Sequence, residues 1–188
     1  MNENRNTTQW LQYLLYACIA ALVSSLLGIF GLNGLARWIN LAVDAVTVYL
    51  LLQLTGSNPR YKKAAIFYAV ALVGGLINNV FLGLAVSICG IVAQYQEYHA
   101  HGELIVDRDP KLADRWNSLF GLEIAVVFIG TMLTGILVGV LVAMTNMDQA
   151  VIVNITTVFV AILGVGLSIL YLNYLKRTIQ ILEDQIVV

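Results

Sequence analysis

The sequence predicts an all-α fold: a polytopic membrane helical bundle of six transmembrane helices arranged as three hairpins, with five spans as the alternative. Hydrophobic residues make up 60% of the 188 residues and charged residues only 11%, whereas about 25% of a soluble domain is charged. The mean hydropathy is +0.83, and most of the chain lies in apolar runs close to the ~20 residues that cross a hydrocarbon core as a helix. The protein is therefore expected in the cell membrane as a multi-pass protein.

Five apolar runs, separated by short polar segments, set the order of the predicted elements. They cover approximately residues 10–32, 38–55, 64–94, 118–145 and 150–174. Four of these runs fit one spanning helix each. The third is too long for one, because a helix from Ala64 to Ala93 would extend about 45 Å at 1.5 Å per residue, against a hydrocarbon core of about 30 Å.

The basic residues favour two crossings in the third run. If the chain starts in the cytoplasm and crosses twice there, only Arg37 of the ten basic residues is outside; one crossing divides them six to four at best. Because cytoplasmic loops are enriched in Lys and Arg, we expect two arms, 61–78 and 80–97, joined by a polar turn at Asn78-Asn79. Charge counting does not separate two full spans from a re-entrant hairpin, and full spans are favoured. The nine cytoplasmic residues are Arg5, Arg60, Lys62, Lys63, Arg108, Lys111, Arg115, Lys176 and Arg177.

The chain, 1–188, is predicted to form a single integral membrane domain with both termini in the cytoplasm. The polar segment 1–9 is expected to be a cytoplasmic tail, and the apolar run after it is too long for a signal peptide and is taken as a retained helix. Residues 98–116 are expected to be a solvated cytoplasmic linker that ends in a helix start, where Asp109 is the N-cap and Pro110 the first helical residue.

The last segment, 175–188, is predicted to be a cytoplasmic amphipathic tail. Its apolar residues fall on one stripe, whereas Lys176, Glu183 and Asp184 lie off it. This pattern suits a helix that lies on the inner membrane surface or docks on a partner. The stripe consists of Ile179, Leu182 and Ile186.

Asp44 lies well inside the second apolar run and shares a helix face with Asn40 and Thr47. Ionisable groups in membrane helices are costly and usually face a bundle interior or a wet cavity, so these three residues are candidates for a substrate or ion site. The favoured alternative is a structural anchor in which Asp44 pairs with Arg37, two turns away on the same face. Glu123, near the start of the run 118–145, is expected to snorkel toward Arg115 or water.

The string His99-Ala-His101-Gly-Glu103 raises the question of a metal site. On an extended strand, His99, His101 and Glu103 would project from one side and form a weak candidate ligand set. On a helix, His99 pairs with Glu103 and Glu97 pairs with His101, on opposite faces. No cysteine or further histidine completes a site, so we expect a solvated linker here, no metal and no cofactor.

Small residues recur at four-residue spacing, which is the pattern by which membrane helices pack closely. We expect them to serve helix packing, within the chain or between copies. They are Ala20, Ser24 and Gly28 in the first run, Gly83 and Ser87 in the third, and Gly135 and Gly139 in the fourth.

The length, the six-helix layout and the small residues from Ala17 to Ala21 are similar to those of the energy-coupling-factor substrate-binding subunits, although no binding residue is carried over. No nucleotide-binding loop, nucleophile elbow or zinc-protease helix occurs, so we expect no enzyme. The favoured function is a helix-packing accessory or effector module. The alternative is a transporter or channel subunit that uses the polar face around Asp44. Expected partners are the lipid bilayer and a second copy or another membrane protein, but no nucleic acid.

Overall fold

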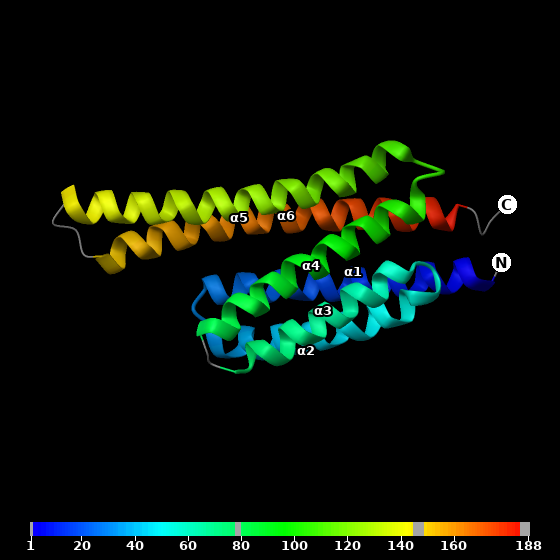
Figure 1. Ribbon diagram of the computed structural model, residues 1–188, viewed down its shortest axis with the longest axis horizontal. Helices are drawn as coiled ribbons and strands as arrows, with labels where there is room; N and C mark the ends of the chain where they lie inside the picture. The colour runs from blue at the N-terminus through cyan, green and yellow to red at the C-terminus, as the bar shows by residue number, and fades with distance from the viewer. Residues whose placement is uncertain (1, 78–79, 145–148, 185–188) are drawn as a thin grey trace.

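The computed structural model of the chain describes residues 2–77, 80–144 and 149–184, and these residues form helices and short turns without any strand. The predicted all-α class is confirmed. The helices are α1 (Asn2–Ile29), α2 (Asn33–Gln53), α3 (Pro59–Gly75), α4 (Val80–Ile105), α5 (Pro110–Met144) and α6 (Gln149–Glu183), with a short 3₁₀ turn, η1 (Leu54–Gly56), between α2 and α3 (Figure 1).

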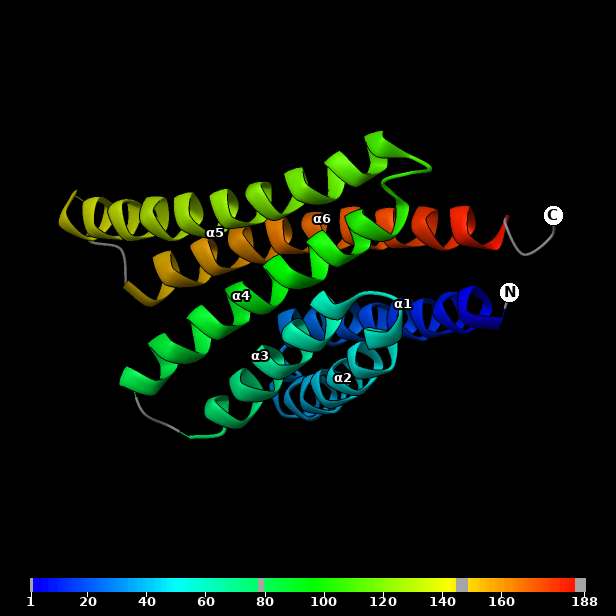
Figure 2. The ribbon, with the colours of Figure 1, turned by 45° about the vertical axis from the view of Figure 1, so that its right-hand side comes forward.

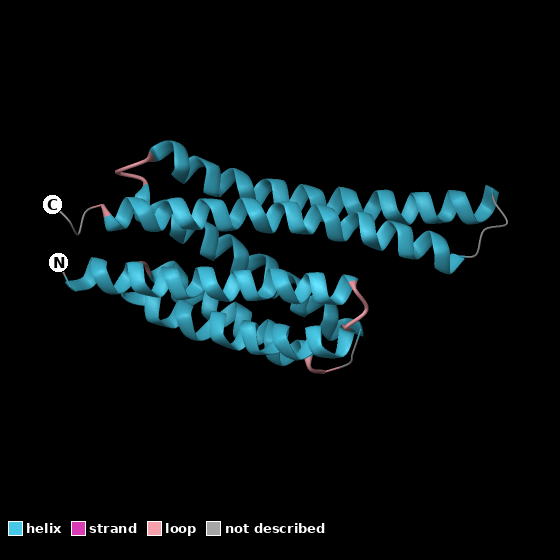
Figure 3. Cartoon of the chain, turned by 180° about the vertical axis from the view of Figure 1, so that it is seen from behind, coloured by secondary structure: helices cyan, strands magenta, loops and turns pink. Residues whose placement is uncertain are grey.

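The six helices form a closed ring. Each helix packs against the next one along the chain, and α6 packs back against α1 (Figures 1 and 2). Both chain ends lie at one end of the ring, together with η1 and the turn 106–109; we call this the termini end (Figure 3). The turn 30–32 and residues 76–77 lie at the opposite end, which we call the loop end.

The long third run does contain two helices. α3 and α4 pack along one another as a hairpin, as the distribution of basic residues predicted. The predicted turn at Asn78-Asn79 lies outside the described residues. Within the described residues, two helical segments, Arg5–Ile29 and Asn33–Gly56, are long and apolar enough to cross a membrane. That all six helices cross remains a prediction.

The starts of α3 and α5 are set by local sequence. The Asn58 side chain accepts a hydrogen bond from the Arg60 backbone N–H at 2.8 Å, and the Asp109 carboxylate accepts one from the Leu112 N–H at 2.9 Å. In both places a proline follows the capping residue, where its missing N–H costs nothing. The helix start predicted at Asp109 and Pro110 is therefore confirmed.

The apolar core lies at the termini end, and three segments predicted to be polar or solvated belong to it. α1 already begins at Asn2, so most of the predicted tail 1–9 is helical, and Thr7 and Thr8 in it are buried. The largest fully buried side chains are those of Leu11, Leu14, Leu51, Leu54, Tyr61, His101, Ile105, Leu112, Trp116, Leu175 and Thr178, with Ser24 farther along α1.

The solvated linker predicted over 98–116 is wrong for most of its length. α4 continues through this segment to Ile105, and Ala100, His101 and Ile105 are fully buried. Glu103 is exposed on the other side of the helix, so a segment rich in polar residues still has a buried face. Gly102 allows α5 to approach closely, because a Cβ at this position would lie 3.3 Å from the carbonyl oxygen of Ala113.

The amphipathic tail was predicted over 175–188, and its described part, 175–184, belongs to the bundle and is not a separate surface helix. α6 runs to Glu183, and the predicted stripe residues Ile179 and Leu182 are buried in the core. The end of α6 is tied to α1 by a hydrogen bond of 2.6 Å from the Gln12 amide to the Glu183 carboxylate. Ile186, the third stripe residue, lies outside the described residues.

Candidate functional site

A cavity of about 1180 Å³ lies within the helical ring, and every one of the six helices contributes to its lining. Its inner boundary is formed by Cys18, Glu97 and Tyr171, next to the buried core. Its lining extends to Asn33 and Leu76, which are exposed beside the turns of the loop end. The cavity is therefore closed toward the termini end and extends toward the loop end.

The polar face predicted on α2 lines this cavity. Asn40, Asp44 and Thr47 all contribute to the wall, as does Arg37. The ion pair expected between Asp44 and Arg37 is not among the ion pairs formed by the described residues. The structure thus brings the three predicted residues together at a cavity, without the anchoring contact that the sequence suggested.

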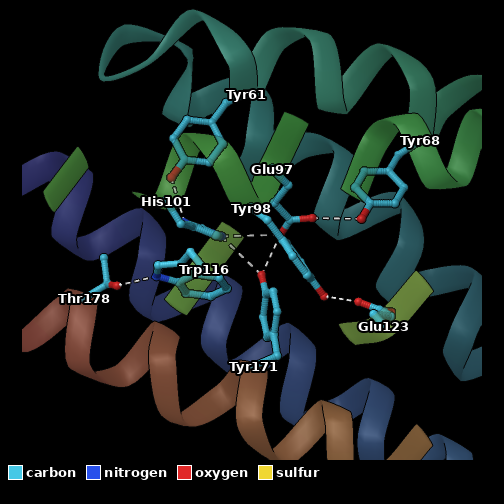
Figure 4. A network of polar contacts seen from close by, with 9 residues as sticks. All are labelled: Tyr61, Tyr68, Glu97, Tyr98, His101, Trp116, Glu123, Tyr171 and Thr178. Atoms are coloured by element: carbon cyan, nitrogen blue, oxygen red, sulfur yellow. Dashed lines mark hydrogen bonds and ion pairs between the residues drawn. The ribbon is translucent and has the colours of Figure 1, made fainter. Parts of the chain in front are cut away.

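Glu97 is the central acidic residue at the closed end, and its carboxylate is buried. The Tyr171 hydroxyl donates to Oε1 at 2.5 Å and the Tyr68 hydroxyl donates to Oε2 at 2.8 Å. The two tyrosines come from α6 and α3, so the carboxylate of α4 joins three helices (Figure 4). Both carboxylate oxygens act as acceptors, which is the role of an ionised carboxylate.

His101 lies one helical turn beyond Glu97, and its ring is fully buried. Nε2 lies 3.6 Å from Glu97 Oε1 and 3.3 Å from the Tyr171 hydroxyl, and Nδ1 lies 2.8 Å from the Tyr61 hydroxyl. Because Tyr171 donates its proton to Glu97, its oxygen accepts from His101 Nε2–H. Nδ1 accepts from the Tyr61 hydroxyl when the ring is neutral and donates to its oxygen when the ring carries a second proton.

A second carboxylate, that of Glu123 on α5, lies at the same end of the cavity. It accepts hydrogen bonds from the Tyr98 hydroxyl at 2.5 Å and from the Gln94 amide at 3.1 Å. Both donors are on α4, and Figure 4 shows the contact with Tyr98. The expectation that Glu123 snorkels toward Arg115 is therefore wrong, because neighbouring donors inside the ring satisfy the carboxylate.

The histidine string is helical, and its side chains point to opposite faces as the helical interpretation predicted. His99 packs on Tyr95, with ring centroids 4.0 Å apart, while His101 faces Glu97. Glu103 accepts hydrogen bonds from Arg60 at 2.7 Å and from Asn58 at 2.9 Å. The part of the chain that the structure describes gathers no three metal-binding side chains at one point.

Glu103 provides a pH-dependent contact between the start of α3 and the end of α4. Partial burial acts to raise its pKa, but the hydrogen bonds from Asn58 and Arg60 outweigh burial and hold the pKa below its ordinary value. A carboxyl whose folded-state pKa is lowered stabilises the fold above its unfolded-state pKa, about 4.3 for Glu. This stability is lost as the pH falls through the folded-state pKa.

We expect Glu103→Gln to lower the free energy of unfolding by on the order of 0.5 kcal/mol at neutral pH, because the pair with Arg60 is solvent-exposed. The difference from the wild type should vanish at acid pH, where Glu103 is protonated. Denaturant unfolding at both pH values measures this, and Asp107→Asn, an exposed acid in the nearby turn, is the control. A difference that does not depend on pH would contradict the assignment.

The small residues fall into two groups. On α1, Ser24 is buried and donates to the Ala36 carbonyl of α2 at 2.8 Å, and a Cβ on Gly28 would lie 3.9 Å from the Ala36 side chain. Ala20 is half-buried on the same helix. The other residues, Gly83, Ser87, Gly135 and Gly139, are exposed, and a Cβ on any of these glycines would meet nothing within 4 Å. Their role in packing between copies remains a prediction.

No family model, curated protein or solved structure matches the chain. The chemistry of the cavity is therefore the basis for assigning a function. The tyrosines that hold Glu97 are 29 and 74 residues away in the sequence. The one signal for the site in the sequence was the i, i+4 spacing of Glu97 and His101.

Proposed function

We propose that this chain is a multi-spanning membrane protein that binds a small organic cation in the cavity of its helical ring, as the substrate-binding or transporting part of a transport system. This is the second of the two functions that the sequence suggested. The observation that carries it is the cavity itself, with acidic side chains from three different helices in its lining.

The outer surface of the ring supports a place in the bilayer. Large apolar side chains are exposed on each of the six helices, which a soluble protein avoids over such an area. They include Val23 of α1, Trp38 of α2, Val73 of α3, Leu84 of α4, Phe128 of α5 and Ile162 of α6. Lipid is the environment in which such a surface is stable, and the two apolar segments at the start of the chain fit the same interpretation.

The charge of the cavity favours a cation. Among the described residues of the lining, Asp44, Glu97 and Glu123 are acidic, and Arg37 is the one Lys or Arg. Arg37 lies near the loop end, far along α2 from the closed end. A cation at the closed end would meet two carboxylates in a weakly screened site, where opposite charges attract strongly. An anion there would be repelled.

The size and the aromatic lining favour an organic ligand. A cavity of about 1180 Å³ is larger than the ~300–1,000 Å³ of a common small-molecule site, and much larger than a bare metal ion needs. Tyr68, Tyr98 and Tyr171 belong to the lining of the closed end. Aromatic faces attract ammonium and similar cations in addition to excluding water from them.

Equilibrium binding of tetraphenylphosphonium to the purified protein in lipid nanodiscs tests the proposal, with empty nanodiscs as the blank. The wild type should bind this cation and not tetraphenylborate, which has the same shape and the opposite charge. Glu123→Gln should raise the Kd roughly ten- to hundredfold, as expected when a charged contact worth about 1.5–3 kcal/mol is lost.

Two further variants decide between the candidate functions. Glu103→Gln removes a carboxylate outside the cavity and should leave the Kd unchanged. Asp44→Asn should weaken binding if Asp44 belongs to the binding site. The packing-module interpretation expects it to change stability alone. Equal binding of tetraphenylphosphonium and tetraphenylborate would overturn the proposed function. Unchanged cation binding in both cavity variants, Glu123→Gln and Asp44→Asn, would overturn it as well.

A further inference from the structure

The closed end of the cavity contains a buried pair, Glu97 and His101, whose side chains lie 3.6 Å apart. We propose that this pair holds a proton that is released when an organic cation occupies the cavity, so that the protein exchanges protons for cations. The inference rests on the proposed function and adds the source of energy that would drive it. Three observations carry it, and a fourth makes it testable.

The first is a continuous chain of hydrogen-bonding groups from the cavity to His101. Tyr68 and Tyr171 both donate to Glu97, the Tyr171 oxygen accepts from His101 Nε2–H, and His101 Nδ1 contacts the Tyr61 hydroxyl, to which it donates when the ring is protonated (Figure 4). Glu97, Tyr68 and Tyr171 line the cavity, whereas His101 lies behind them. A proton on His101 can therefore pass through Tyr171 and Glu97 to water in the cavity.

The second is the charge balance of the two states. With the proton bound, the pair is Glu97 carboxylate and His101 imidazolium; without it, Glu97 alone is charged. A cation that enters beside Glu97 would repel the imidazolium at short range in a buried, weakly screened site. When the proton leaves as the cation enters, the total charge of the closed end is the same before and after.

The third is the set of titratable groups around the pair; the permanent positive charge of Arg60, which precedes Tyr61 in the chain, is paired with Glu103 at 2.7 Å. The phenols and the thiol among them are uncharged near neutral pH, and the remaining groups are carboxylates. Among the described residues at this site, His101 is thus the one group that can take up a positive charge. The set comprises Cys18 of α1, Asp44 of α2, Tyr61 and Tyr68 of α3, Tyr98 and Glu103 of α4, Glu123 of α5 and Tyr171 of α6.

The fourth observation is a built-in reporter of the proton. The Trp116 ring lies against the His101 ring, with centroids 4.6 Å apart and planes 34° apart. An imidazolium in this position quenches indole fluorescence more strongly than a neutral imidazole does. The other two tryptophans can be replaced, because Trp38 is 71% exposed and Trp10 lies at the edge of the core. Trp10→Phe with Trp38→Phe leaves Trp116 alone.

The experiment is a pH titration of Trp116 fluorescence in this double variant, in nanodiscs, with and without saturating cation. Tetraethylammonium and tetraphenylphosphonium serve as probes, because neither carries a proton of its own. We expect fluorescence to fall on acidification, and the midpoint to move to lower pH by about one unit or more with cation bound, a tenfold loss of proton affinity. Glu97→Gln should lower the midpoint without cation, and Asp107→Asn, at an exposed acid outside this set, should change neither the midpoint nor its shift.

Each outcome decides a different point. Persistence of the full transition in His101→Gln would overturn the assignment of the proton to His101. If that variant does not fold, proton release into weakly buffered solution decides instead: about one proton per bound cation supports the exchange, and none overturns it. If a cation binds but the midpoint of the Trp116 titration does not move, the proton exchange is overturned and the proposed cation binding is not. Absence of binding by every probe, measured by equilibrium dialysis, overturns the proposed function and the exchange with it.

Discussion

Trp116→Ala should lower the free energy of unfolding by about 3–5 kcal/mol, the range measured for buried tryptophan and phenylalanine truncations. Trp116 is fully buried at the termini end. Its ring packs against those of Tyr98, His101 and Tyr171, and its indole N–H donates to Thr178 at 3.1 Å. Truncation would create a cavity and leave the buried Thr178 hydroxyl without this partner.

Reversible denaturant unfolding in detergent micelles, followed by circular dichroism, measures this loss. The matched control is Trp38→Ala, which removes the same side chain from an exposed position on α2 and should change stability by less than about 0.5 kcal/mol. If both variants lost similar stability, the core would not lie where the structure places it.

The second large effect tests the proposed membrane topology. In a variant without Cys18 and Cys89, single cysteines at Gly34 and Ile77 should react completely with an impermeant maleimide added to intact cells. Single cysteines at Gly56 and Asp107 should react only after permeabilisation. Gly34 and Ile77 are exposed at the loop end, and Gly56 and Asp107 are exposed at the termini end. Nine of the ten basic residues also lie at the termini end, which the positive-inside rule assigns to the cytoplasm.

These positions avoid the helix caps Asn58 and Asp109, whose replacement would disturb α3 and α5. A Cβ at Gly34 would meet nothing within 4 Å, so a cysteine fits there. Ile77 distinguishes the two kinds of hairpin, because in a re-entrant pair it would lie at membrane depth, protected from the reagent. Reaction of the Asp107 position from outside would contradict the six-span topology.

The sequence was sufficient for the number and order of the helices, because those follow from local properties. Apolar runs, the excess length of the run 64–94 and the sidedness of the basic residues are all visible without knowledge of long-range contacts. The ends of the helices were less predictable. His101 and Thr178 lie in polar segments, and nothing nearby in the sequence shows that partners from other helices bury them.

The candidate site was predicted only where one helix carries it. Asn40, Asp44 and Thr47 share a face of α2, and their spacing alone was enough to bring them to the cavity wall. Glu97 and Glu123 belong to the site because side chains of other helices hydrogen-bond to their carboxylates. Tyr68 of α3 donates to Glu97, and Gln94 and Tyr98 of α4 donate to Glu123. A single sequence does not reveal such pairings, because the same tyrosines are equally typical of residues at the membrane interface.

The contact between the first and last helices has a consequence for the connectivity of the chain. α6 packs against α1, the Gln12 amide reaches Glu183, and both ends of the chain lie at the same end of the molecule. The ring therefore depends on the cyclic order of its three hairpins and not on which hairpin comes first. A circularly permuted gene, with the old ends joined and new ends at a turn, would encode the same cavity.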